Sequence, residues 1–135
     1  MNKRKWVKWI VIAVPFLFLL AFALSYIPHK IINIEPTKVS KIAILDENSI
    51  KLIEITNESE INHLVSNLKE ITFQKGTPSI GYIEFSYQAV FLDNKGEAIQ
   101  GLTINSRDTM TYNGFFYKSK DGTIDYEYIE ELVSK

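Results

Sequence analysis

The sequence predicts an α+β domain behind an N-terminal transmembrane helix, with the order β-β-α-β-β-β-β-β-α after the anchor. Three observations predict it: an uncharged stretch near the start, two amphipathic helical stripes, and several short β-rich runs joined by turn residues. Two helices packed on a mainly antiparallel sheet bury one core in this class. We expect a basic N-terminus and anchor over 1–28, a tether over 29–37 and an extracytoplasmic domain over 38–135.

The expected anchor is the uncharged stretch 9–27. A helix of these 19 residues spans roughly 28 Å, close to the hydrocarbon thickness of a bilayer. Four basic residues precede the stretch, and only Lys30 follows it closely. Because positive charge is retained on the cytoplasmic side, we expect the N-terminus inside the cell and the C-terminal domain outside. The lipid bilayer is therefore the first expected partner, contacted through residues 9–27.

A cleaved signal peptide is the alternative interpretation of this stretch. The segment Ala21-Phe22-Ala23 has the small-x-small pattern of a cleavage site, and cleavage after Ala23 would give a secreted domain. Signal-peptide apolar cores run about 7 to 15 residues, whereas this one continues through Ile27. The length favours an uncleaved anchor.

The first half of the domain predicts a hairpin followed by a helix. The β-branched runs 41–45 and 49–55 are separated by Asp46-Glu47-Asn48, whose side chains favour turns. Over 56–70, Asn57 is placed as the N-cap, with Glu60 three positions on. Helical spacing unites the apolar residues that should face a sheet: Ile61, Leu64, Val65 and Leu68.

The second half predicts an antiparallel meander closed by a helix. Turn residues 93–96 separate the runs 82–92 and 98–105, and Asn113-Gly114 is the two-residue hairpin signal. The run 82–92 alternates, and one face is expected to hold Ile83, Phe85, Tyr87, Ala89 and Phe91. The stretch 125–135 is amphipathic, and its expected inner side holds Tyr126, Tyr128, Ile129, Leu132 and Val133.

Charge and composition exclude several classes of function. The residues after the apolar stretch carry 11 basic and 16 acidic side chains, a difference of −5. This acidic balance without a basic run argues against a nucleic-acid partner, because such binding depends on Lys and Arg at the phosphates. The chain has no cysteine, so disulfides, thiol nucleophiles and thiolate metal sites are absent.

The sequence contains no recognisable catalytic, cofactor-binding or metal-binding set. His29 lies at the membrane boundary, and His63 should face water on its helix without a partner at catalytic spacing. The segment 93–97, "DNKGE", resembles a calcium loop but lacks its ligand spacing, so a hairpin turn is the better interpretation. Three acids on the last helix are better explained as a solvated face: Glu127, Glu130 and Glu131.

Aromatic residues crowd the last third of the chain. Six of them fall within 17 residues: Tyr112, Phe115, Phe116, Tyr117, Tyr126 and Tyr128. Alternate members are expected to fill the core, and those that point outward would form an apolar patch for a protein or lipid partner. The candidate partner contacts are Phe115, Phe116 and Tyr117.

These segments together resemble uncharacterised small membrane-anchored or secreted extracytoplasmic proteins of Gram-positive bacteria. The resemblance lies in the basic and apolar start and in "ITNESEINHLVSNLKEITF", "GYIEFSYQAVFLDNKGEAIQGLTI" and "YNGFFYKSKDGTIDYEYIEELV". It implies a location and a fold type, and no site residues.

We therefore expect a single-pass protein with a non-enzymatic binding or accessory role at the cell envelope. Its expected partner, besides the bilayer, is an envelope or membrane protein. The alternative is a secreted or anchored sensor or inhibitory module that grips a small ligand or peptide in a pocket. An enzyme using carboxylates would require two inward acids close together, and the sequence offers no such pair.

Overall fold

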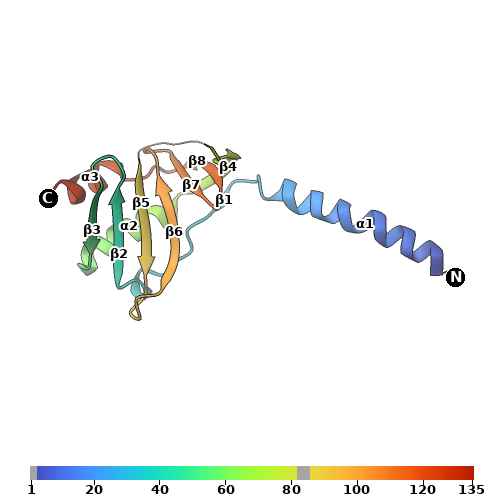
Figure 1. Cartoon of the computed structure of the whole chain (residues 1–135), viewed down its shortest axis with the longest axis horizontal. Coiled ribbons are helices and arrows are strands. Elements are labelled where there is room, and N and C mark those ends of the chain that lie inside the picture. The colour runs from blue at the N-terminus through green and yellow to red at the C-terminus, as the bar shows by residue number, and fades with distance from the viewer. Residues whose placement is uncertain (1–2, 82–85) are drawn as a thin grey trace.

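The computed structural model describes residues 3–81 and 86–135. In this part of the chain it forms an α+β domain with an apolar N-terminal helix that projects away from the domain (Figure 1). The helices are α1 Lys3–Leu24, α2 Glu58–Glu70 and α3 Tyr126–Ser134, with a short 3₁₀ helix, η1, over Pro36–Lys38. The strands are β1 His29–Lys30, β2 Lys41–Asp46, β3 Lys51–Ile55, β4 Thr72–Pro78, β5 Tyr87–Leu92, β6 Ala98–Ile104, β7 Thr109–Tyr112 and β8 Phe115–Asp121.

Helix α1 is long and apolar enough to be a membrane span or a signal sequence. None of its side chains is buried against the domain, and Trp9 is 73% exposed. The helix ends at Leu24 and gives way to turns through Ile27, earlier than the expected end of the 9–27 span. The Ser25 hydroxyl donates to the Phe22 carbonyl, and Pro28 disfavours helical backbone at Ile27, so both act against further helix.

The strands within residues 3–81 and 86–135 all pair antiparallel in one sheet of order β1-β4-β8-β7-β6-β5-β2-β3. The sequence predicts one strand fewer, because β1 has only two residues and lies in the expected tether. Strand β1 pairs with β4 through His29 opposite Phe73 and Lys30 opposite Thr72. Two residues are too few to show a periodic pattern in the sequence, so this strand forms through its tertiary contact with β4.

The hairpins between β2 and β3, β5 and β6, and β7 and β8 lie where the turn residues predict them. Asn113 and Gly114 have φ of 51° and 81°, the positive values that the two-residue turn requires. In the β5–β6 turn, Asp93 Oδ1 accepts from the backbone N–H groups of Lys95 and Glu97 at 2.9 and 3.0 Å. The segment 93–97 therefore uses this carboxylate to close a turn.

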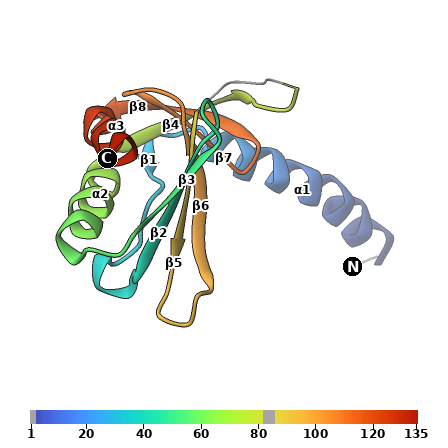
Figure 2. The same cartoon turned by 60° about the vertical axis from the view of Figure 1, so that its left-hand side comes forward.

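One face of the sheet is covered by α2 and α3, which lie together on its left in Figure 2. The predicted stripe of α2 is confirmed, because Ile61, Leu64, Val65 and Leu68 are all buried. Ile129, Leu132 and Val133 of α3 are buried as expected, and Tyr126 and Tyr128 are half-buried. The alternation of 82–92 holds at Tyr87, Ala89 and Phe91, whereas Ile83 and Phe85 lie outside the described residues.

The N-cap of α2 is also confirmed. Asn57 Oδ1 accepts from the N–H groups of Ser59 and Glu60 at 2.9 and 3.1 Å. These bonds satisfy two of the donors that a helix start leaves open, a contribution of about 1 kcal/mol.

The expected tether is packed against the domain over most of its length. Ile32 is fully buried and Ile34 is 7% exposed, both in the same core as the helices. Burying one such side chain contributes about 1.5–3 kcal/mol. Residues 31–38 therefore form a wall of the domain.

Candidate functional site

The junction between α1 and the domain is built around Lys75 of β4. Its ammonium lies 4.0 Å from the ring centre of Phe115, 5.1 Å from that of Phe22 and 5.3 Å from that of Tyr26. The same Nζ lies 3.4 Å from Ser25 Oγ, next to the carbonyl end of α1, where a cation is favoured by the helix dipole. Lys75 thus connects the C-terminal end of α1 to the sheet.

A pocket lies between the 31–38 segment and strands β6 and β7. It has a volume of about 400 Å³, within the range of ligand pockets of about 300–1,000 Å³. We call it the Ile34 pocket, and its lining is Ile31, Asn33, Ile34, Glu35, Lys38, Ile99, Gln100 and Tyr112. It exists because the segment after α1 folds back on the sheet instead of extending as a spacer.

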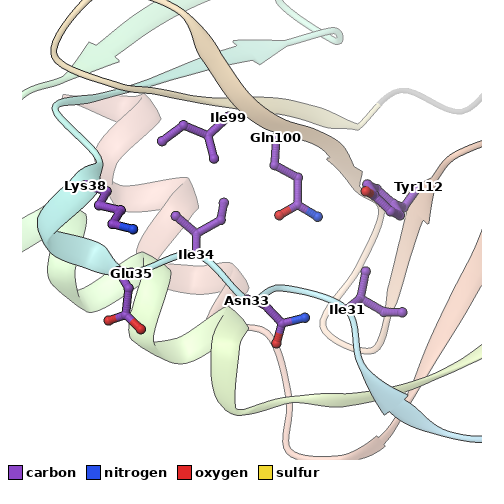
Figure 3. A pocket seen from close by; sticks show the side chains of 8 residues that line it. All are labelled: Ile31, Asn33, Ile34, Glu35, Lys38, Ile99, Gln100 and Tyr112. Atoms are coloured by element: carbon purple, nitrogen blue, oxygen red, sulfur yellow. The ribbon is translucent and has the colours of Figure 1, made fainter.

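The side chains of the Ile34 pocket are arranged by chemistry along its length (Figure 3). Lys38 lies at one end, the Gln100 amide points into the middle, and Tyr112 lies at the other end near Ile31. Ile34 and Ile99 face one another across the space. The pocket therefore combines apolar walls with a central hydrogen-bonding group and a terminal positive charge.

The face of the sheet opposite the helices forms a second candidate surface, the open sheet face. Strand alternation places on it the residues between the buried ones, and none of these is buried: Lys41, Ala43, Leu45, Leu52, Glu54, Gln88, Val90, Leu92, Gly101, Thr103, Thr111, Phe116 and Lys118. One row crosses six strands from Leu52 of β3 to Phe116 of β8. This row is uncharged, with leucines at one end, Phe116 at the other and the polar side chains of Gln88, Thr103 and Thr111 between them. Apolar side chains on an uncovered face make it a candidate interaction surface.

The open sheet face is continued by an unusual hairpin. Ile50, between β2 and β3, is 84% exposed and has a φ of 54°, a backbone region that β-branched residues rarely occupy. Leu52 beside it is 61% exposed. The hairpin therefore holds two apolar side chains in solvent at the edge of the sheet.

The predicted partner contacts divide between the two faces of the sheet. Tyr117 is only 7% exposed, and Phe115 packs half-buried beneath Lys75, so both lie on the helix-covered face. Burial raises the pKa of the Tyr117 hydroxyl, and the nearby hydroxyls of Tyr112 and Tyr26 raise it further. Phe116 alternates with them and lies on the open sheet face. The three side chains therefore lie on two faces of the sheet, and their role as partner contacts stays a prediction.

A cluster of polar and aromatic side chains joins α2 to α3, and the sequence did not predict it. His63 Nε2 lies 2.7 Å from Asp125 Oδ2, and the His63 ring stacks on Tyr128 with ring centres 3.8 Å apart. Asn67 Nδ2 donates to the Thr123 carbonyl at 3.0 Å, and Asn67 Oδ1 accepts from the Asp125 N–H at 2.9 Å. His63 and Asn67 are four residues apart and share a helix face, the one local signal that could have indicated the cluster.

The His63–Asp125 cluster stabilises the packing of α2 against the segment before α3. Burial raises the pKa of the Tyr128 hydroxyl, and the negative charges of Glu60, Asp125 and Glu131 raise it further, in that order. No hydroxyl side chain among the described residues is hydrogen-bonded to His63, and His63 does not line the Ile34 pocket. Within the described ranges no cluster of three or more His, Cys, Asp or Glu side chains could hold a metal ion.

Comparisons with protein-family models, with curated proteins and with solved structures found no match for this chain. The resemblance to Gram-positive extracytoplasmic proteins accordingly stays a prediction.

Proposed function

We propose that this chain is a single-pass membrane protein that displays a non-enzymatic binding domain on the outer side of the cell membrane. The observation that carries the proposal is α1, a helix of 22 residues with no side chain buried against the domain. An apolar helix left bare in water is unfavourable, and a bilayer is the environment that covers it on every side. The four basic residues before the apolar stretch support an N-terminus in the cytoplasm.

The binding role rests on the open sheet face. Antiparallel sheets that face water on one side usually carry polar residues there, whereas this face mixes polar and charged side chains with leucine, valine, alanine and phenylalanine. The Lys75 junction holds the domain close to the membrane, so the partner we propose is another membrane or envelope protein.

Expression of the full chain with a C-terminal epitope in bacteria tests the anchor and its orientation. The protein should remain with membranes after carbonate extraction, and protease added to whole cells should remove the epitope. Replacing the four N-terminal basic residues with neutral ones should give a mixture of both membrane orientations: Lys3, Arg4, Lys5 and Lys8. The matched control neutralises four exposed lysines of the domain, which should leave orientation unchanged: Lys95, Lys118, Lys120 and Lys135.

Two outcomes would contradict the proposal. Recovery of the mature chain in the culture fluid with Leu24 as its first residue would favour the cleaved signal peptide. An epitope that stays protected in whole cells would contradict the orientation.

The binding surface is tested separately by photocrosslinking in cells. A crosslinker at Thr103, on the open sheet face, should capture a defined membrane or envelope protein. The same group at Asn62, on the exposed side of α2, should not. Equal capture from both positions would contradict the assignment of the surface.

A second candidate function is that of an anchored or secreted module that binds a small ligand or peptide. The observation that favours it is the Ile34 pocket, whose size and mixed lining are those of ligand sites. The two functions are compatible, because the pocket and the open sheet face are formed by different sets of side chains.

A further inference from the structure

We propose that the Ile34 pocket binds the C-terminal end of a short peptide, with the free carboxylate at Lys38. This inference rests on the second candidate function proposed above and names the ligand of the Ile34 pocket.

The positive end of the pocket favours a carboxylate. Glu35 also lines the pocket, but its carboxylate is 3.2 Å from Lys69 Nζ and its side chain points away from the space in Figure 3. Among the residues that the structure describes, Lys38 makes no ion pair. Its ammonium is therefore left to interact with a ligand.

The acidic balance of the domain does not prevent this interaction. Charges more than about 8 Å apart are largely screened at physiological ionic strength, so the distant acids act weakly on a bound anion. A carboxylate in direct contact with Lys38 would instead form a charge-assisted hydrogen bond, about twice as strong as a neutral one.

The middle of the pocket favours a peptide group and an aliphatic side chain. The Gln100 amide points into it and offers both a donor and an acceptor, which matches the N–H and C=O of a peptide bond. Ile34 forms an apolar floor at 7% exposure, and Ile99 stands over it at 41% exposure. A ligand side chain between them would remove both from water.

The other end of the pocket favours a second apolar residue. Tyr112 and Ile31 line this end, opposite to Lys38 (Figure 3). Lys38, the Gln100 amide and the apolar walls follow one another along the pocket. They match, in the same order, the carboxylate, the last peptide group and the apolar side chains at the C-terminal end of a peptide. A free phosphate would interact with Lys38 but would leave the isoleucines without an apolar contact.

The test measures calorimetric binding of acetyl-Leu-Ala-Leu to the full chain in detergent micelles, against the same peptide with a C-terminal amide. The free acid should bind one to one, at least tenfold more tightly than the amide. Lys38→Gln should remove that difference by weakening the free acid alone. The control Lys120→Gln alters an exposed lysine outside the pocket and should leave both affinities unchanged. Ile99→Ser should weaken both peptides by a similar factor.

Any of three results would overturn the proposal. These results are absence of saturable binding, equal affinity for acid and amide, or complete displacement of the peptide by equimolar inorganic phosphate. The measurement uses purified protein, so a chain that proved to be secreted would still give the same ratio of affinities. Failure of the anchor and failure of the peptide site are therefore distinguishable.

Discussion

Asn67 provides a sharp test of how α2 and α3 are held together. Its amide bridges two backbone groups of the segment before α3, the Thr123 carbonyl and the Asp125 N–H. A neutral hydrogen bond contributes about 0.5–1.5 kcal/mol net, so the pair is worth about 1–3 kcal/mol. Because Thr123 is exposed, water replaces part of that loss. We expect Asn67→Ala to lower the free energy of unfolding by about 1–2 kcal/mol.

The matched control is Asn62→Ala on the same helix. Asn62 is exposed, and its contact is a 3.4 Å bond from the Ser66 hydroxyl, so the substitution should cost little. A third variant, Asn67→Asp, keeps an acceptor for the Asp125 N–H but sets a carboxylate oxygen against the Thr123 carbonyl. It should be at least as destabilised as Asn67→Ala.

Urea unfolding of the full chain in micelles, followed by far-ultraviolet circular dichroism, measures these differences. Tryptophan fluorescence is unsuitable, because both tryptophans, Trp6 and Trp9, lie in α1. A loss below about 0.5 kcal/mol for Asn67→Ala, or an equal loss for Asn62→Ala, would refute the reasoning.

Two further predictions concern the junction and the response to acid. Lys75→Met should raise the rate of backbone hydrogen exchange over residues 25–30 by about 2- to 30-fold, since a cation–π contact contributes about 0.5–2 kcal/mol. Lys118→Met is the control. Equal exchange rates in the two variants would contradict the role of Lys75 at the junction. Hydrogen bonds from Ser106 and then Thr109 hold the pKa of Asp108 below its ordinary value of 3.8. The charged carboxylate therefore stabilises the fold above that pH, and the contribution is lost as pH falls through the folded pKa. Asp108→Asn should thus lower the free energy of unfolding most at neutral pH and least in acid. Urea titrations at several pH values measure this, and a decrease that does not depend on pH would contradict the prediction.

Several parts of the fold were readable from the sequence because their causes are local. The stripe of α2 from Ile61 to Leu68, its Asn57 cap and the Asn113-Gly114 turn each depend on residues a few positions apart. The apolar character of α1 is likewise a property of a continuous stretch. Strand alternation grouped Phe115 with Tyr117, but the inward face of β8 was decided by its pairing with β4 and β7.

The tertiary structure alone decided the long-range contacts, including those that form the Ile34 pocket. The pairing of β1 with β4, the burial of Ile32 and Ile34, and the His63–Asp125 contact join residues far apart in the chain. The Ile34 pocket combines the 31–38 segment with Ile99, Gln100 and Tyr112 in the same way. A local pattern encodes propensity, whereas these contacts form because folding the whole chain buries apolar surface. The sequence by itself therefore determined the kinds of element and the apolar N-terminal helix, and packing decided which surfaces of the domain stay exposed.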